Sequence, residues 1–224
     1  MGVKVQIYCR QPTLGEMQIL HEIGTHNLAW DVDPKSGDAI VRSKLISNFC
    51  RDVKSTSVLL IHSSKLSVIT AVAEMVRPDY LLLSSVRNDD EMPELALRLK
   101  GVTRLMMSVP VLPVQDNSKE IDSLSLAKKY SAFAGCLILD TCPSPSRIGS
   151  FGCTGQTNDW SVCSEIVKSA SLPVILAGGL NPENVKNAIE TVSPYGVDAC
   201  TSLELSDKSK NIERCRLFIS ETRG

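Results

Sequence analysis

The chain has 224 residues, 43% of them hydrophobic, and a formal net charge of -1 at pH 7. This length and apolar content suffice for one large buried core. The balanced charge excludes the basic surface that nucleic acid or an anionic membrane attracts, and no stretch approaches the roughly 20 apolar residues of a membrane span. Because no signal-peptide pattern opens the sequence, we expect a cytoplasmic protein whose partner is a small molecule.

Segments with strand and helix patterns alternate along the chain. Strands are expected at 3–8, 27–32, 57–61, 80–83, 104–109, 136–140, 173–177 and 197–201. Helices are expected at 13–23, 38–50, 66–76, 93–99, 118–133, 158–170, 182–192 and 207–222. This alternation, with no dividing linker, predicts a parallel sheet and a single-domain (β/α)8 TIM barrel over residues 1–224. A doubly wound open sheet is the alternative, but the first strand lacks the G-x-G-x-x-G turn of that class.

The last two expected strands end in residues that suit a phosphate group. Gly178 and Gly179 follow the seventh strand, and a helix begins directly after them. Thr201 and Ser202 end the eighth strand. Because the carboxyl ends of barrel strands meet at one face, these segments should present backbone N–H groups and small polar side chains to one anion. We therefore expect a phosphate site; the alternative is that the glycines only form tight turns.

Five motifs, taken together, resemble those of one enzyme family. They are LDT at 139–141, GCTG at 152–155, DW at 159–160, PVILAGGLNPENV at 173–185 and GVDACTSLE at 196–204. On these motifs the chain is similar to the phosphoribosylanthranilate isomerase family of tryptophan biosynthesis. The resemblance implies an aldose-to-ketose isomerisation of a phosphoribosyl amine, without metal or organic cofactor. It also implies that Gly152, Thr154 and Gly155 join the two segments above in binding the phosphate.

The resemblance assigns the general acid to Asp140, which would protonate the ribose ring oxygen while a base removes the proton from C2′. Asp140 ends an apolar strand. Burial there should raise the pKa of its carboxyl group toward the range of a useful acid. The alternative is that Asp140 only orients the loop that follows.

The first strand departs from the family pattern of lysine, isoleucine, cysteine and glycine, in which the cysteine is the base. In the ungapped register Tyr8 stands at the position of that cysteine, and Cys9 comes one residue late. Strand residues alternate between faces, so Cys9 should point away from the barrel interior unless a bulge restores it. Cys9 is kept as a candidate catalytic base, whose thiolate Arg10 would favour, and His62 is an alternative base.

Two further departures concern the aromatic end of the substrate. Asp38 occupies the place of the family arginine that meets the anthranilate carboxylate. An aspartate there would repel that carboxylate unless Lys35 or Arg42 takes over the role of the arginine. Leu83, Ser84 and Ser85 replace a family leucine, histidine and glycine. Arg87 and Arg147 are further candidates for holding an anion.

Two hypotheses of function therefore stand. The first is a phosphoribosylanthranilate isomerase or a relative that acts on another phosphorylated sugar amine or sugar. The second is a non-catalytic barrel that kept the phosphate site after losing the base. In both, the partner is a phosphorylated small molecule, nucleic acid and membrane are not expected, and the chain acts as a monomer or homodimer.

The eight cysteines are spread along the chain without a C-x-x-C pair. This spacing favours reduced thiols over a zinc site or a dithiol centre, and no metal site is expected. Cys142, Cys153 and Cys163 nevertheless fall around one expected loop, which leaves a redox pair or a metal site there as an alternative.

Overall fold

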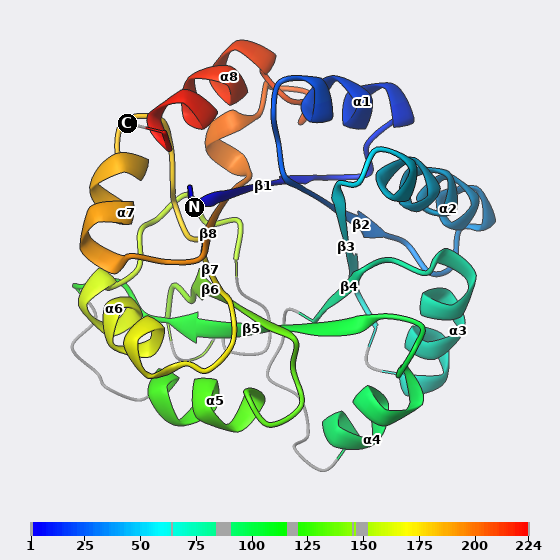
Figure 1. Cartoon of the computed structure of the whole chain (residues 1–224), viewed down its shortest axis with the longest axis horizontal. Coiled ribbons are helices and arrows are strands. Elements are labelled where there is room, and N and C mark those ends of the chain that lie inside the picture. The colour runs from blue at the N-terminus through cyan, green and yellow to red at the C-terminus, as the bar shows by residue number, and fades with distance from the viewer. Residues whose placement is uncertain are drawn as a thin grey trace.

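The computed structural model describes residues 2–63, 65–83, 91–115, 121–144, 146 and 152–223. Eight parallel strands form a closed barrel in the order β1 to β8, and helices surround it as a ring (Figure 1). The last helix, red in the figure, lies beside the first, in blue, so the two ends of the chain close the ring. The predicted (β/α)8 barrel is confirmed, and the open sheet is excluded.

The strands and helices lie close to their expected positions. The strands are β1 (Lys4–Cys9), β2 (Asn27–Val32), β3 (Thr56–Ile61), β4 (Tyr80–Leu83), β5 (Arg104–Val111), β6 (Cys136–Thr141), β7 (Val174–Leu176) and β8 (Gly196–Ala199). The helices are α1 (Leu14–Glu22), α2 (Gly37–Asp52), α3 (Leu66–Val76), α4 (Glu91–Arg98), α5 (Ser123–Tyr130), α6 (Trp160–Ser169), α7 (Val185–Val192) and α8 (Ile212–Glu221). Residues 118–120, where α5 was expected to begin, lie outside the described part.

The end of β8 and the start of α8 differ from the expected positions. β8 ends at Ala199, because the backbone turns at Cys200 into a short 3-10 helix, η2 (Thr201–Leu203). α8 begins at Ile212 rather than at 207, because the side chain of Asn211 caps it by accepting the N–H of Arg214. The intervening residues form a turn in which Glu204 pairs with Lys210.

Pro110 lies inside β5, although a strand end was expected at 109. Pro110 pairs with Asp140 of β6, whereas the described pairing of β5 with β4 extends only to Met107. Proline has no N–H to give to a neighbouring strand, so it is tolerated where one edge of a strand has no ladder partner. The strand therefore continues and carries the wall of the barrel two residues further.

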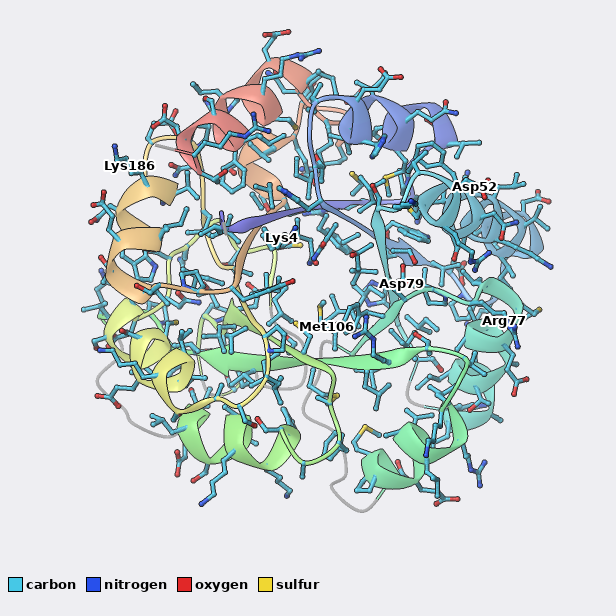
Figure 2. All side chains as sticks on the ribbon, viewed as in Figure 1. Lys4, Asp52, Arg77, Asp79, Met106 and Lys186 are labelled. Atoms are coloured by element: carbon cyan, nitrogen blue, oxygen red, sulfur yellow. The ribbon has the colours of Figure 1, made fainter. Side chains whose placement is uncertain are left out.

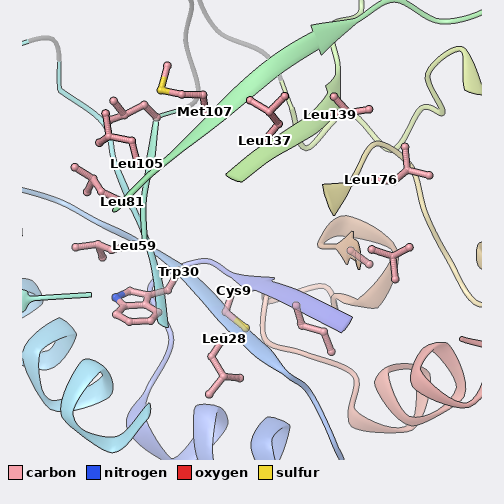
Figure 3. Packing of buried hydrophobic residues seen from close by; sticks show 14 of the residues in the cluster. Cys9, Leu28, Trp30, Leu59, Leu81, Leu105, Met107, Leu137, Leu139 and Leu176 are labelled. Atoms are coloured by element: carbon pink, nitrogen blue, oxygen red, sulfur yellow. The ribbon is translucent and has the colours of Figure 1, made fainter. Parts of the chain in front are cut away.

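Alternate strand residues build two separate hydrophobic clusters. The larger lies between the strands and the helix ring and contains Cys9, Leu28 and Trp30 (Figure 3). Trp30 also donates a hydrogen bond from Nε1 to Ser43 Oγ at 3.0 Å, which fixes α2 against β2. The smaller cluster fills the barrel interior and includes Tyr8 and Met106; Met106 is labelled near the centre of Figure 2. The two clusters leave the carboxyl end of the interior to polar groups.

The turn after β7 packs closely against the loop after β6, and a glycine makes this contact possible. At Gly179 φ is +61°, and an added Cβ would lie 2.5–2.7 Å from backbone atoms of Gln156 and Thr157. Backbone atoms cannot move aside as a flexible side chain can. Gly101 has a similar φ of +82° but open space around it, so it offers a matched comparison.

Replacing Gly179 by alanine should therefore destabilise the protein more than replacing Gly101. We expect Gly101→Ala to lower the free energy of unfolding by about 1 kcal/mol through backbone strain alone, and Gly179→Ala by about 2–4 kcal/mol through strain and overpacking. Urea unfolding of both variants measures the difference. Equal losses would show that the contact between the two loops does not constrain Gly179.

Candidate active site

A cavity of about 470 Å3 opens at the carboxyl ends of the strands. Every strand, or the segment directly after it, contributes to the wall: Tyr8, Asp31, Leu60, Leu82, Ser108, Asp140, Ala177 and Asp198 in order from β1 to β8. This face is where (β/α)8 barrels carry their chemistry. The turns after β6, β7 and β8 form one side of the rim, and the segments after β1 to β3 form the other.

The structure brings all but one of the expected site residues to this cavity. Asp140 lines it together with the seven residues expected to bind phosphate: Gly152, Thr154, Gly155, Gly178, Gly179, Thr201 and Ser202. Cys9 is not brought there. It lies in the outer cluster beside Leu28 and Trp30 (Figure 3).

Cys9 is held away from the cavity by regular strand pairing. β1 pairs residue by residue with β2 from Gln6 through Cys9, so no bulge turns Cys9 inward. Burial raises the pKa of the Cys9 thiol well above its usual range, although Lys210 acts in the opposite direction. The placement of Cys9 as a catalytic base is therefore corrected by the structure: the thiol faces the helices and stays protonated.

Tyr8 takes the inward position that the family gives to its cysteine, and it lines the cavity. Burial, followed by the nearby charge of Asp31, raises the pKa of the Tyr8 hydroxyl far above neutrality. A phenol in this state donates a hydrogen bond but does not accept a proton at neutral pH. Neither residue at this end of β1 can therefore serve as the base.

The carboxyl groups of Asp140 on β6 and Asp198 on β8 lie in one row of inward-facing residues. Leu139 pairs with Leu176, and Leu176 pairs with Val197, all on the outer face. The next residue on each strand, Asp140, Ala177 and Asp198, therefore faces the interior. Ala177 holds the position between the two aspartates in this row, and all three residues line the same cavity.

Asp140 is positioned by its own backbone and by the loop after β6. The N–H of Thr141 donates to Oδ1 at 2.7 Å. Gly152 packs directly on Oδ2, where a Cβ would overlap with the carboxylate. Burial raises the pKa of Asp140 to about 6, partly offset by the hydrogen bond from Thr141. The carboxyl group is thus partly protonated near neutral pH, as the sequence predicted for a general acid.

Asp198 has an even higher pKa, of about 7, because of burial and the neighbouring charge of Asp140. The amide of Gln6, its partner in the β1–β8 ladder, and the charge of Lys210 act in the opposite direction. Among the described residues, no well-formed hydrogen bond reaches Oδ1 of Asp198 or Nε2 of Gln6. Two buried polar atoms on the cavity wall are therefore left for a ligand hydroxyl.

Asp198 is not among the expected site residues, although the sequence carries a signal for it. Asp198 is the one charged residue in the apolar strand GVDA, two positions after a glycine and at an inward register. An acid on the inner face of a barrel strand near its carboxyl end is in the usual place for chemistry. Because the rest of the strand is apolar, its overall pattern indicates burial alone.

The rim near β1 to β3 carries charged groups. Arg10 lines the cavity, and its Nε lies 3.2 Å from Glu204 Oε1. His62 also lines the cavity, 60% of its side chain is exposed, and its Nε2 lies 3.7 Å from Asp31 Oδ2. His62 thus has the orienting partner that the sequence did not reveal, but it stands at the exposed edge rather than beside the carboxyl row.

The expected substitutes for the family arginine are not at the cavity. Lys35, Asp38 and Arg42 lie before and within α2 and are absent from the described lining. Ser84, Ser85, Arg87 and Arg147 lie outside the described residues. Arg10 is therefore the arginine that the described cavity offers to an anionic group.

The rim near β6 to β8 is bound together by short polar contacts. Ser202 Oγ donates to the carbonyl of Leu180 at 2.6 Å, and Thr141 Oγ1 donates to that of Gln156 at 2.7 Å. Because the Ser202 hydroxyl proton is engaged, it cannot also be donated to a phosphate. Backbone N–H groups of the glycine turns, which precede α7, remain as candidate donors to an anion.

The start of α7 lies later than expected. Asn181 and Asn184 accept each other's backbone N–H through their side chains at 2.9 Å, and Asn181 also accepts the N–H of Val185 through its carbonyl. These contacts form a separate turn, so the helix begins at Val185 rather than at 182. This turn joins Gly179 to the helix and fixes the chain that follows the glycine turn.

No group of three or more histidine, cysteine, aspartate or glutamate residues within the described ranges is arranged to hold a metal ion. None of the described helices combines the length and apolarity needed to cross a membrane. Cys142 and Cys163 are buried, whereas Cys153 is exposed and its Sγ lies 3.8 Å from Sγ of Cys200. The thiol that the structure places beside Cys153 therefore comes from after β8 and not from the loop of the three cysteines considered above.

The chain is similar to known proteins of one family. The family model described as N-(5'phosphoribosyl)anthranilate (PRA) isomerase matches residues 98–221. The N-(5'-phosphoribosyl)anthranilate isomerase of Methanocella arvoryzae is 32% identical over 182 residues, which cover 81% of this chain and 79% of the relative. Isomerase 1 of Methanosarcina mazei is 31% identical over 194 residues, covering 85% and 80%.

Solved structures share the fold. The phosphoribosyl anthranilate isomerase of Thermotoga maritima superposes with a TM-score of 0.75 at 23% identity, covering 98% of this chain and 99% of that one. A phosphoribosyl anthranilate isomerase in complex with reduced 1-(o-carboxyphenylamino)-1-deoxyribulose 5-phosphate gives 0.73 at 22% identity, covering 99% of both chains. From the family model and the relatives above 30% identity, the chain belongs to the N-(5'-phosphoribosyl)anthranilate isomerase family.

Proposed function

We propose that this protein is a phosphoribosylanthranilate isomerase of tryptophan biosynthesis. It would convert N-(5'-phosphoribosyl)anthranilate, an aminoaldose, into the corresponding aminoketose as a cofactor-independent intramolecular oxidoreductase. The observation that carries the proposal is the row of two carboxyl groups, Asp140 and Asp198, beside a glycine-rich anion site in one cavity. The names of the relatives support the same reaction.

Asp140 is the general acid in this proposal. Its protonated carboxyl group gives a proton to the ribose ring oxygen, the C1′–O bond breaks, and the nitrogen lone pair forms an iminium at C1′. With a pKa of about 6, below the value of about 7 for Asp198, Asp140 holds the shared proton in a minority of molecules near neutral pH, and that minority form, with Asp198 ionised, is the reactive one. Contact with Gly152 holds it toward the cavity.

Asp198 is the general base, in place of the cysteine of the family pattern. Its carboxylate removes the proton from C2′, the C–H electrons form the C1′–C2′ double bond, and the iminium electrons return to nitrogen. The enol that results tautomerises to the ketone. Asp198 is preferred over Tyr8 and Cys9 because it lines the cavity and has a pKa of about 7, whereas those residues stay protonated or face outward.

The two ends of the substrate have different partners. Gly152, Thr154, Gly155, Gly178, Gly179, Thr201 and Ser202 surround the phosphate, chiefly through backbone N–H groups. Arg10, which follows β1 next to β8, meets the anthranilate carboxylate. Arg10 follows the first strand, whereas the arginine of the family pattern follows the second.

Nothing favours the non-catalytic alternative, because an acid and a base face the same cavity. We further propose that residues 1–224 act as one catalytic domain in the cytoplasm, as a monomer or a homodimer. One of the similar solved structures is of monomers generated from the dimeric isomerase of T. maritima, which supports the homodimer as the first state to test.

Turnover of N-(5'-phosphoribosyl)anthranilate, generated in the assay from anthranilate and phosphoribosyl pyrophosphate, tests the function. The wild-type protein should form the aminoketose and restore growth of a tryptophan auxotroph that lacks the isomerase. Asp140→Asn should lower kcat roughly 100- to 10,000-fold, because the amide cannot protonate the ring oxygen. Circular dichroism confirms that the variant is folded. Absence of both turnover and growth with the wild-type protein would refute the proposal.

Asp198→Asn tests the base, with Cys9→Ala as the matched control. We expect Asp198→Asn to lower kcat roughly 100- to 10,000-fold with little change in KM, and Cys9→Ala to retain turnover. Loss of turnover in Cys9→Ala, with activity kept in Asp198→Asn, would show that Cys9 rather than Asp198 is the base.

The dependence of kcat/KM on pH should also show that Asp140 acts as an acid and Asp198 as a base. Activity rises as Asp198 loses its proton and falls as Asp140 loses its own, so kcat/KM of the wild-type protein should be bell-shaped with a maximum between about 6 and about 7. The residual activity of Asp198→Asn should lack the acidic limb. A flat profile from pH 5 to 8 would contradict the carboxyl pair.

Arg10→Ala tests the partner of the anthranilate carboxylate. Loss of a charged hydrogen bond should raise KM about tenfold to a hundredfold with a smaller effect on kcat. Arg10→Lys should restore part of the affinity. Arg42→Ala, on α2 and away from the described cavity lining, should leave KM unchanged. A rise in KM for Arg42→Ala alone would reassign the carboxylate site.

A further inference from the structure

Two cysteines face each other across the rim of the cavity. The Sγ atoms of Cys153 and Cys200 lie 3.8 Å apart, although the residues are 47 positions apart in the sequence. Cys153 belongs to the loop after β6 and is exposed, and Cys200 directly follows β8 and is half-buried. Both line the cavity. The other six cysteines are buried.

Charged groups surround this pair. Lys210 Nζ lies 3.8 Å from Cys200 Sγ and donates to the carbonyl of Cys200 at 3.0 Å. Cys200 Sγ also lies 3.2 Å from Glu204 Oε1, and Arg10 binds the same Glu204 oxygen. On the cavity side the charges of Asp140 and Asp198 face Cys153. A buried lysine and an arginine thus stand beside two thiols that none of the proposed catalytic steps uses.

The two thiols have different proton affinities. The hydrogen bond with Cys200 lowers the pKa of Cys153, and Arg10 adds to this, while burial, Asp140 and Asp198 oppose it. That same hydrogen bond, together with burial, raises the pKa of Cys200. An exposed cysteine whose pKa is lowered, within reach of a thiol whose pKa is raised, is the arrangement of an attacking and a resolving cysteine.

We propose that Cys153 and Cys200 are a thiol modification site, which low-molecular-weight disulfides convert into a reversible intramolecular disulfide that impairs the substrate cavity. The Cys153 thiolate attacks one sulfur of the reagent RSSR, which forms a Cys153–SR mixed disulfide and releases RS−. The Cys200 thiol gives its proton to water, attacks the Cys153 sulfur and releases a second RS−. The protein loses two electrons, and the reagent gains them.

The bridge requires only a small local movement. A disulfide bond is about 2.05 Å long, so the two sulfurs must approach by about 1.8 Å from their present separation. The bridge would join the loop of Gly152 to Gly155 to the turn of Thr201 and Ser202. Gly152 also contacts Asp140, so a shift of this loop changes both the anion site and the acid. The effect on turnover rests on the proposed function, whereas formation of the bridge does not.

The test treats the reduced full-length protein with oxidised glutathione. Mass spectrometry of an unreduced digest should find one linked peptide pair, Cys153 with Cys200. Turnover should fall on the order of tenfold or more, because small displacements of reacting groups are costly, and dithiothreitol should restore it. Binding of inorganic phosphate, measured by calorimetry before and after oxidation, should weaken in parallel.

Three variants separate the pair from other thiols. In Cys153→Ser and in Cys200→Ser the ratio of oxidised to reduced activity should stay near one, whatever the basal rate. Cys142→Ser is the matched control from the same loop, because serine can keep the hydrogen bond that Cys142 Sγ donates to the carbonyl of Ser144. It should still show the full loss.

Absence of the linked peptide in the folded protein would overturn the proposal, and so would a complete bridge that leaves both turnover and phosphate binding unchanged. If the reduced protein forms the bridge and binds phosphate but has no turnover, the proposed function fails and the modification site stands.

Discussion

The withdrawal of two carboxyl groups from water is the constraint on which the rest of the site depends. Asp140 and Asp198 stand on β6 and β8 with Ala177 at the position between them in the row, in a cavity whose wall includes Leu60, Leu82 and Ile138 of the interior cluster. Burial favours the neutral form of each group, and the charge of Asp140 further raises the pKa of Asp198. A pair that titrates near neutral pH can hold one proton between them, which is what an isomerisation by acid and base needs.

The loops around this pair are built to keep it in place. Gly152 packs on Asp140, and Gly179 lets the turn after β7 lie directly on the loop after β6. Ser202 and Thr141 tie the same segments together through their hydroxyl groups. The proposed phosphate site and the acid are therefore parts of one packed unit, and Cys153 and Cys200 contact each other at its edge. A covalent link there acts on both at once.

Much of the fold and half of the site follow from local patterns. Regular strand and helix periods predict the barrel, and alternation along β1 predicts that Cys9 turns outward in the absence of a bulge. The function of Asp198 and the approach of Cys153 to Cys200 depend on how the strands close around β7, which no local pattern contains. Element ends at Cys200 and Asn181 also depend on contacts between distant turns, so sequence periodicity placed them wrongly.

The central claim is that Asp140 and Asp198 titrate together near neutral pH. Carbon-13 NMR of carboxyl-labelled aspartate, recorded against pH and assigned with Asp140→Asn and Asp198→Asn, measures this in the resting protein. We predict two linked titrations with pKa values of about 6 and about 7, and a lower pKa for Asp198 once Asp140 is replaced. Two independent titrations near the ordinary aspartate value of about 3.9 would contradict it.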